Sequence, residues 1–387
     1  MKRFKLVYVA IATLFAVTAC SKTESLINSD NTAQLKSAAI NGKYIVVLNN
    51  DATIVSDALE GRNEKVKAKA LGLLKKYEIT DPVEEVYSTA LQGFTVKMAP
   101  GQAKKLEADG LIKRVEADKV ISLSPITANG KPAPTPVAQS KPWGITRVNG
   151  GIDATGKVAW IIDSGIDLDH PDLNVGLSLS KTFLGSKTTA DDQNGHGTHV
   201  AGTIAAKNNS IGVIGVAPNA TVIAVRVLDR NGSGSTSGVI AGVDYVASKA
   251  SANDVANMSL GGGVSTTLDE AVVNASTKCK FALAAGNESD DADNHSPARV
   301  NGNNIYTVSA MDSNNIFAYF SNYGSAVDYC EPGVKIYSTY KDGGYATLSG
   351  TSMAAPHLAG LLILGTVKTD GRVTGDTDGA PDPIGVH

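Results

Sequence analysis

The stretch from Gly350 to Pro356 reads GTSMAAP, and the interpretation of the whole chain starts from it. Small residues precede its one serine, and an apolar run from Leu358 to Leu364 follows it. The run predicts a helix with Pro356 in its first turn, where proline is tolerated. Ser352 then lies at the start of that helix, where backbone N–H groups favour a developing negative charge. This position suits a nucleophilic serine, although an ordinary N-cap serine would look the same.

Two further stretches supply the partners that a nucleophilic serine requires. Serine is a poor nucleophile unless a base takes its proton and a third group orients that base. His196 lies in the stretch 194–203, NGHGTHVAGT, and Asp163 ends a short apolar run that reads as a buried strand. These motifs, in the chain order Asp, His, Ser, resemble those of the subtilisin-like serine proteases (subtilases), and within them the proteinase K-like branch. The resemblance covers about residues 141–364.

The resemblance implies a serine endopeptidase that needs no cofactor for catalysis. Ser352 would be the nucleophile, His196 the general base and acid, and Asp163 the carboxylate that orients the imidazole. Asn287 matches the family's oxyanion-hole position, where its side-chain amide and the Ser352 backbone N–H would be the donors. Taken alone, Asn287 would be interpreted as a turn residue after Gly286.

Glycine-containing segments resemble the two family edges that pair with an extended substrate. Glycine suits such edges because another backbone must approach closely, and main-chain pairing accepts any sequence. Two glycine-rich surface turns are the alternative interpretation. Ala284, Ala285 and Gly286 would line a roomy apolar pocket, which the family resemblance links to broad cutting after aliphatic or aromatic residues. The predicted substrate-binding residues are Gly232, Ser233, Gly234, Ser259, Leu260, Gly261, Ala285 and Gly286.

Two acidic positions raise the hypothesis of structural calcium. Asp328 falls where the proteinase K-like branch supplies a calcium carboxylate, with backbone oxygens near Asn303 and Ile305, and calcium favours such oxygen ligands. The sequence around Asn303 departs from the branch. The stretch 376–382, DTDGAPD, has the character of a calcium loop, but its spacing is not that of an EF-hand, and we favour a solvated tail.

The N-terminus reads as an export signal. Basic residues within the first five positions precede an apolar run from Leu6 to Val17, which is short for a transmembrane helix. The run ends in VTAC, which resembles a bacterial lipobox and implies a signal peptide over 1–19 and a lipid on Cys20. A plain signal peptide with a chance cysteine is the alternative. We expect an exported protein that is held to the cell envelope by this lipid until it is processed and released.

Bulk composition limits the other partners. The formal net charge of the 387-residue chain is -3, so no nucleic-acid or polybasic membrane surface is implied. We expect protein or peptide substrates, membrane contact only through Cys20, and a monomer. Cys279 and Cys330 either form one disulfide in an oxidising compartment or are buried thiols, and we favour thiols.

A small α+β domain is predicted over residues 42–125, after a polar tether over 20–41. Its strand and helix patterns follow the ferredoxin-like order β-α-β-β-α-β, with a strand predicted at Val86–Leu91. A small domain before a subtilase core resembles the family's inhibitory propeptide, which fills the cleft until it is cut away; a permanent accessory domain is the alternative. The Pro-rich linker over 126–142 is extended chain, where we expect self-cleavage.

Residues 143–387 form the predicted catalytic domain. Apolar strand candidates alternate with helical patterns, which predicts a doubly wound α/β fold with a mostly parallel sheet and helices on both faces. In such sheets the chemistry gathers at the carboxyl ends of the strands, as Asp163 and Asn287 would require. From Asp370 the chain is short and rich in Gly and Asp, so either it packs irregularly or a closing layer is missing.

Two rival functions remain at this point. The first is a catalytically silent binding protein on the subtilase fold, against which every triad position is filled. The second is a related acyl-transfer enzyme such as an esterase or a peptide ligase, although ligase relatives usually alter the nucleophile and Ser352 is intact.

Overall fold

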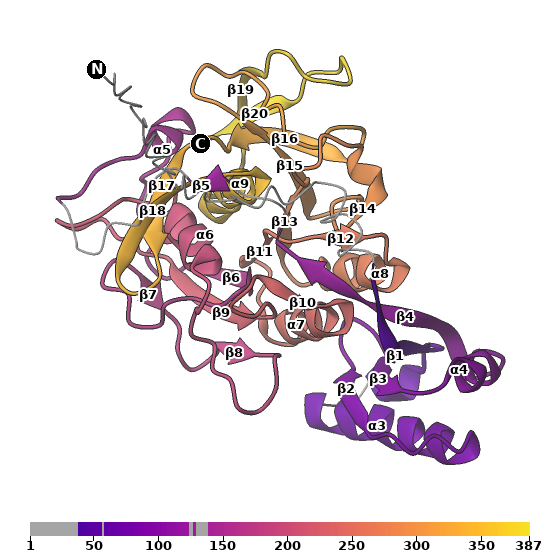
Figure 1. Cartoon of the computed structure of the whole chain (residues 1–387). Helices are drawn as coiled ribbons and strands as arrows, with labels where there is room; N and C mark the ends of the chain where they lie inside the picture. Colours follow the sequence, from indigo (N-terminus) through magenta and orange to yellow (C-terminus); the bar gives the residue numbers. More distant parts are fainter. Residues whose placement is uncertain (1–37, 56–57, 124–126, 129–137) are drawn as a thin grey trace, which may run out of the picture.

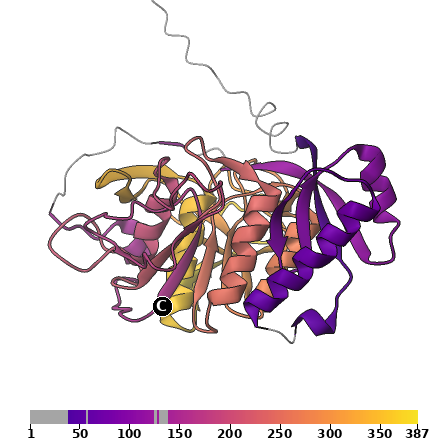
Figure 2. The same cartoon turned by 90° about the horizontal axis from the view of Figure 1, so that it is seen from below.

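The computed structural model describes residues 38–55, 58–123, 127–128 and 138–387. They form a small N-terminal part, indigo and purple in Figure 1, and a larger α/β part. In Figure 2 the small part lies against one side of the larger part.

The predicted signal peptide, Cys20 and most of the Pro-rich linker lie outside the described residues. Within the part of the chain that the structure describes, no helix is both long and apolar enough to cross a membrane.

The small part is a four-stranded antiparallel sheet with two main helices. Its elements are β1 (Ala39–Leu48), α2 (Ala52–Val55), α3 (Leu59–Lys76), β2 (Val83–Tyr87), β3 (Gly93–Lys97), α4 (Pro100–Glu107) and β4 (Ile112–Ser122). Its strands lie in the order β4–β1–β3–β2, and β10 of the larger part continues the sheet beyond β4. Apart from the short α2, this is the predicted β-α-β-β-α-β order.

One predicted strand of the small part is misplaced. The strand expected at Val86–Leu91 is β2, which begins at Val83 and ends at Tyr87. The next three backbone N–H groups turn away and donate to the carboxylate of Asp244 in the larger part. A contact between distant segments therefore ends the strand, and no local pattern could have indicated it.

The larger part has one central sheet. Its helices are α5 (Trp143–Arg147), α6 (His196–Ala205), α7 (Thr236–Lys249), α8 (Thr266–Ala275), the 3₁₀ helix η1 (Ala292–Asn294) and α9 (Thr351–Leu364). Its strands are β6 (Val158–Asp163), β7 (Asn174–Val175), β8 (Lys181–Thr182), β9 (Thr221–Arg226), β10 (Ser233–Ser235), β11 (Val255–Met258), β12 (Gly262–Gly263), β13 (Lys280–Ala284), β14 (His295–Ser296), β15 (Ile305–Met311), β16 (Val327–Pro332), β17 (Ile336–Tyr340), β18 (Gly344–Ser349), β19 (Lys368–Arg372) and β20 (Pro383–Val386). The two-residue β5 (Thr127–Ala128) pairs with β18.

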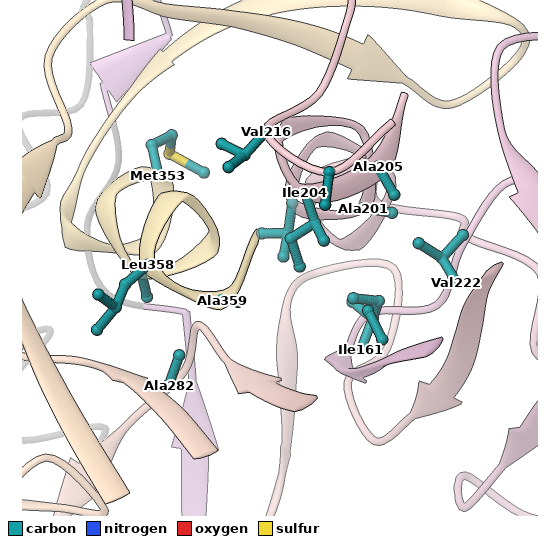
Figure 3. Packing of buried hydrophobic residues seen from close by; sticks show 14 of the residues in the cluster. Ile161, Ala201, Ile204, Ala205, Val216, Val222, Ala282, Met353, Leu358 and Ala359 are labelled. Atoms are coloured by element: carbon teal, nitrogen blue, oxygen red, sulfur yellow. The ribbon is translucent and has the colours of Figure 1, made fainter. Parts of the chain in front are cut away.

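The sheet order is β19–β20–β16–β15–β13–β11–β6–β9–β7, and every pair from β20 to β7 is parallel. Successive side chains of a strand point to opposite faces. Ile161 of β6 therefore packs with α6 and α9, whereas Trp160 and Ile162 pack with α7 and α8. Figure 3 shows the first face, where Ile161 and Ala282 lie with the apolar side chains of α6 and α9. The predicted parallel sheet with helices on both faces is confirmed.

The C-terminal tail is more regular than we expected. β19 and β20 form an antiparallel pair, and β20 joins β16 at the edge of the central sheet. Val373 and Ile384 are buried against Met311 and Phe317, and this apolar contact holds the tail in place. The expectation that the tail packs irregularly is therefore wrong.

Both cysteines of the larger part are buried thiols, as we favoured. They lie in different apolar clusters, Cys279 beside α7 and α8 and Cys330 beside β20. Burial raises the pKa of the Cys279 thiol to about 12, so it stays protonated and unreactive.

Candidate active site

Asp163 and His196 are in direct contact. Asp163 is the last residue of β6, and His196 is the first residue of α6. The imidazole Nδ1 lies 2.8 Å from Asp163 Oδ1 and 3.0 Å from Oδ2, and both side chains are buried. Because a carboxylate only accepts, Nδ1 carries the proton, and Nε2 of the neutral ring is left as an acceptor. Among the described residues, Nε2 has no hydrogen-bond partner.

Ser352 is near the start of α9, but it is not the helix cap. Gly350 is the N-cap, and it has no side chain of its own to cap the helix. The Ser352 hydroxyl instead donates to the carbonyl oxygen of Ser259 at 3.2 Å. The N-cap interpretation of Ser352 is thus excluded, and its hydroxyl is bonded to Ser259 and not to His196.

Pro356 lies in the second turn of α9, not in the first turn as predicted. A proline has no N–H, so the carbonyl of Ser352, four residues earlier, has no partner within the helix. The Ser259 hydroxyl donates to that carbonyl at 2.9 Å. Ser259 and Ser352 therefore bond to each other twice, and this links a predicted substrate-binding segment to the backbone of the predicted nucleophile.

Asn287 is fixed against the same helix. Its amide oxygen accepts from the N–H and from the hydroxyl of Thr351, both at 2.8 Å. The Thr351 hydroxyl also accepts from Gly286 N at 3.1 Å. These bonds identify the oxygen end of the Asn287 amide and direct its NH₂ end away from Thr351.

The predicted substrate-binding edges pair with the end of the small part. Ser233, Gly234 and Ser235 of β10 pair antiparallel with Ser122, Ile121 and Val120 of β4. On the other side, Ser122 forms a bridge with Gly261. Leu123 N then donates to Gly232 O at 2.9 Å. The side chain of Ile121 is buried in the apolar cluster that contains Leu228 and Leu260. The end of β4 thus occupies the slot between the two predicted edges.

Beyond this slot the chain is held again. Thr127 and Ala128 pair antiparallel with Ser349 and Leu348, at the end of β18. Ser349 is three residues before Ser352. The described residues on either side of 124–126 are therefore held at two separate places, Leu123 on Gly232 and Thr127 on Ser349.

Two residues that we predicted to line the substrate pocket, Ala285 and Gly286, lie directly after β13. Ala285 is fully buried and its N–H donates to Val308 O at 3.0 Å, while Gly286 N bonds to Thr351. Both follow the carboxyl end of β13, as the parallel sheet requires.

The structure gives limited support to the calcium hypothesis. Asp328 accepts from Thr307 N at 2.8 Å, and its partial burial raises its pKa. Among the described residues, no group of three or more His, Cys, Asp or Glu side chains could hold a metal ion. A calcium ion at Asp328 would therefore also need other oxygen ligands, such as backbone carbonyls or water.

The stretch 376–382 is not simply a solvated tail. Asp382 is buried and accepts from the Ser309 hydroxyl at 2.6 Å, and Asp376 accepts from Asp382 N. That expectation is therefore wrong for Asp382, because β20 draws it into the edge of the sheet.

The remaining buried histidines near the site have structural bonds. His199 Nε2 lies 3.0 Å from Ile336 O, and His357 Nδ1 lies 2.8 Å from Met353 O. Burial lowers the pKa of His199 to about 3 and that of His357 to about 4, so both rings are neutral at ordinary pH.

The matches to known proteins agree with this arrangement. The family model for the subtilase family, Peptidase_S8, matches residues 155–370, and the model for peptidase inhibitor I9 matches residues 43–124. The chain belongs to the subtilase family. This confirms the predicted serine endopeptidase class, with a subtilisin-like α/β core preceded by an inhibitor-type propeptide domain.

Relatives of this subtilase include a serine exoprotease and a subtilisin. It is 41% identical over 341 residues to alkaline serine exoprotease A of Vibrio alginolyticus, a match that covers 84% of this chain and 60% of the relative's length. It is 45% identical over 234 residues to subtilisin Savinase of Lederbergia lenta, covering 59% of this chain and 84% of the relative. The chain thus spans less than two thirds of the Vibrio protein.

A solved structure is also similar. The crystal structure of a cold adapted subtilisin-like serine proteinase matches with a TM-score of 0.57 and 41% identity, over 62% of this chain and 96% of that one.

Sequence reasoning missed several residues that hold this site together. Thr351 anchors Asn287, the Ser259 hydroxyl bonds to the backbone of Ser352, and Asp192 binds the start of α6. In the sequence, these residues are marked only by their position next to a motif. Such a position does not indicate which atom each side chain binds.

Proposed function

We propose that this subtilase hydrolyses peptide bonds with Ser352 as nucleophile, His196 as general base and acid, and Asp163 as the orienting carboxylate. The observation that carries the proposal is the imidazole of His196. Asp163 binds its Nδ1, and its buried Nε2 has no partner among the described residues. A neutral imidazole held in this tautomer is ready to accept a proton at Nε2.

Catalysis then requires one local movement. The Ser352 hydroxyl leaves the Ser259 carbonyl and turns toward His196 Nε2. As its Oγ forms a bond to the substrate carbonyl carbon, its proton passes to Nε2 and the carbonyl oxygen becomes negative. Collapse of this intermediate breaks the C–N bond, and the departing amine takes the proton from Nε2. Water repeats the sequence and releases the acid.

The negative oxygen would be bound by the Asn287 NH₂ and the Ser352 backbone N–H. The Asn287 amide oxygen is already fixed by Thr351, so its NH₂ needs no reorganisation at the moment of reaction. Such a preorganised donor contributes about 3 kcal/mol to lowering the barrier.

We propose that substrates bind as an extended strand between residues 232–234 and 259–261, with Ala285 and Gly286 beside the cleaved bond. The end of β4 occupies the same slot, pairing with β10 and with Gly261. Main-chain pairing of this kind supports acceptance of many sequences, with a broad preference for apolar side chains.

The same occupancy supports the propeptide domain as an intramolecular inhibitor. We propose that 42–125 is this inhibitor, 126–142 the linker and 143–387 the catalytic domain. Because Leu123 and Thr127 are held on either side, we place the first cut between them. Mass spectrometry of the first processing intermediate tests this placement; an intermediate cut only beyond residue 138 contradicts it.

We further propose export through the N-terminal signal, with a lipid on Cys20 as in the lipobox resemblance. A cut after Leu123 would leave this lipid on the propeptide and free the protease. A mature protein that still carries Cys20 would contradict the release.

Structural calcium at Asp328, as in the proteinase K-like branch, is a separate proposal. Calcium there should raise the melting temperature of the wild type, and EDTA should remove the increase. Asp328→Asn should show no response to either addition. An equal response of the two proteins would exclude this site.

The central experiment compares the wild type with Ser352→Ala as full-length chains. The wild type should process itself and bind a fluorophosphonate probe at Ser352, whereas Ser352→Ala should stay uncut and unlabelled.

A silent binding protein is the second candidate, favoured by the bond of the Ser352 hydroxyl to Ser259 rather than to His196. Folded wild type that neither processes nor labels would support it. Activity on p-nitrophenyl esters without activity on casein would instead indicate an esterase.

A further inference from the structure

The carboxylate of Asp192 lies between the two segments that carry Asp163 and His196. It is buried and accepts five hydrogen bonds, all from uncharged donors. Oδ1 accepts from Ser164 Oγ at 3.0 Å and from the N–H groups of Asn194 and Gly195, both at 2.9 Å. Oδ2 accepts from the N–H of Thr198 at 3.0 Å and from its hydroxyl at 2.7 Å.

The bonds to Asp192 supply acceptors for N–H groups at the start of α6. Its N-cap is Gly195, which has no side chain to cap the first turn and sits at φ 107°. The first N–H groups of a helix need acceptors from elsewhere. Asp192 accepts from Gly195 and Thr198, so a carboxylate outside the helix caps the turn that contains His196.

Ser164 connects the Asp192 carboxylate to Asp163, the partner of His196. Its hydroxyl donates to Asp192 and accepts from Gly197 N at 3.0 Å, and its own N–H donates to Asp163 Oδ1 at 2.7 Å. A continuous set of hydrogen bonds therefore connects the Asp163 carboxylate, Ser164, Asp192 and the first turn of α6.

We propose that Asp192 is a positioning residue for catalysis, which sets the distance and angle between His196 and Asp163. The inference rests on the proposed roles of these two residues. Asp192 touches neither substrate nor Ser352; it acts by fixing the start of α6 against the end of β6. Both carboxylate oxygens of Asp192 accept from N–H or O–H donors. Asparagine at this position would have only one acceptor oxygen, and its NH₂ group would face a donor.

Asp192→Asn tests the proposal, with Asp172→Asn as the matched control. Asp172 is also buried and also accepts a backbone N–H, that of Val213 at 3.0 Å, together with Asn209 Nδ2. Both variants should lose comparable stability. Asp192 belongs to the set of hydrogen bonds around His196 and Asp163, whereas Asp172 lies outside it.

The measured quantities are kcat per fluorophosphonate-labelled site, KM, and the NMR resonance of the His196 Nδ1 proton. A misplacement of about 1 Å costs on the order of 100-fold in rate. Asp192→Asn should therefore lower kcat per labelled site by about 100-fold, leave KM within a few-fold, and shift or broaden the Nδ1 resonance. Asp172→Asn should leave kcat and the resonance unchanged.

Ser164→Ala is a milder second variant, because it removes the two hydroxyl bonds of Ser164 but keeps Asp192 and its four other hydrogen bonds. It should give a smaller fall in kcat with the same change in the resonance. If Asp192→Asn does not mature, the rate of self-cleavage of the refolded full chain replaces kcat.

Wild type without labelling or self-cleavage would reject the proposed function itself. Active wild type, with Asp192→Asn and Asp172→Asn equal in kcat per labelled site and in the Nδ1 resonance, would overturn the role of Asp192 alone.

Discussion

Single polar atoms, more than whole side chains, determine how this site can work. The Asn287 amide shows this most clearly, because its two ends are used differently. Thr351 holds the oxygen end, so the NH₂ end is the one that a substrate oxygen would meet in the proposed mechanism.

Asn287→Ala should therefore lower kcat by about 100-fold to 1,000-fold with little change in KM, because the lost donor acts mainly on the transition state. Steady-state kinetics on a peptide substrate measure the effect. Thr351→Val, which keeps the shape but loses one anchoring bond, is the control and should lose less. A variant Asn287→Ala whose KM rises while kcat is unchanged would place Asn287 in ground-state binding instead.

Asp382 shows how the environment of one carboxyl group changes its chemistry. Burial raises its pKa to about 7, and nearby Asp376 and Asp378 add to the increase. The folded state therefore holds a proton on Asp382 that the unfolded chain, with an ordinary pKa near 3.9, has already released. Stability from this group is present below about pH 4 and is lost as the pH rises toward 7.

Asp382→Asn should abolish this part of the pH dependence, because an amide has no proton to lose in that range. The difference in melting temperature between Asp382→Asn and the wild type should move in favour of the variant between about pH 4 and pH 7. Thermal melts across the range measure it on the uncut Ser352→Ala background. A difference that is constant with pH would mean that Asp382 has no raised pKa.

At the scale of elements, the central relation is that between α6 and β17. Side chains of β17 donate to carbonyl oxygens of α6: Thr339 Oγ1 to Thr198 O at 2.7 Å and Ser338 Oγ to His199 O at 2.8 Å. β17 pairs with β18, which leads directly into α9. The helix that carries His196 and the helix that carries Ser352 are thus joined through one hairpin.

This contact needs a glycine at position 202. A methyl group there would collide with the hydroxyls of Thr339 and Ser338. Gly202→Ala should destabilise the protein by about 1–3 kcal/mol, as overpacking does, and lower the melting temperature. Gly238→Ala on α7, where a methyl group would meet Ser235 Oγ at 3.3 Å, is the milder control. Equal melting temperatures for the two variants would show that β17 can move away from α6.

At the scale of the whole molecule, carboxylates on both sides connect the propeptide to the catalytic part, and three of them accept backbone N–H groups of the other part. Asp118 accepts from the N–H and hydroxyl of Ser237 at the start of α7, and Glu116 accepts from those of Thr267 at the start of α8. In the opposite direction, Asp244 of α7 accepts three N–H groups of the loop after β2. Figure 1 shows α7 and α8 on the side of the core that faces the propeptide.

Asp244→Asn should weaken inhibition by the cleaved propeptide by about 10-fold or more, because a hydrogen bond to a charged acceptor contributes about 1.5–3 kcal/mol. The delay between cleavage and the appearance of activity measures this, and it should shorten in the variant. Asp153→Asn, an exposed aspartate that bonds to Asn219 and Thr155, should keep the wild-type delay. An unchanged delay in Asp244→Asn would assign the inhibition to the β4 strand alone.

The sequence alone determined which chemistry is present and which class of fold carries it. The motifs around Asp163, His196 and Ser352, taken together, are typical of serine proteases and of few other proteins. Alternating strand and helix patterns predicted the parallel sheet, because side-chain periodicity follows directly from local geometry.

Only the tertiary structure decided which atoms meet. The bond between Ser352 and Ser259, the cap that Asp192 provides for α6, and the turn that Asp244 imposes after β2 all join residues that local patterns cannot relate. The tail from residue 370 looked polar and irregular, yet Val373 and Ile384 pack against Met311 and Phe317 and place it on the sheet. Local sequence sets propensity, whereas hydrogen-bond partners and burial depend on segments that are distant in the chain and close in space.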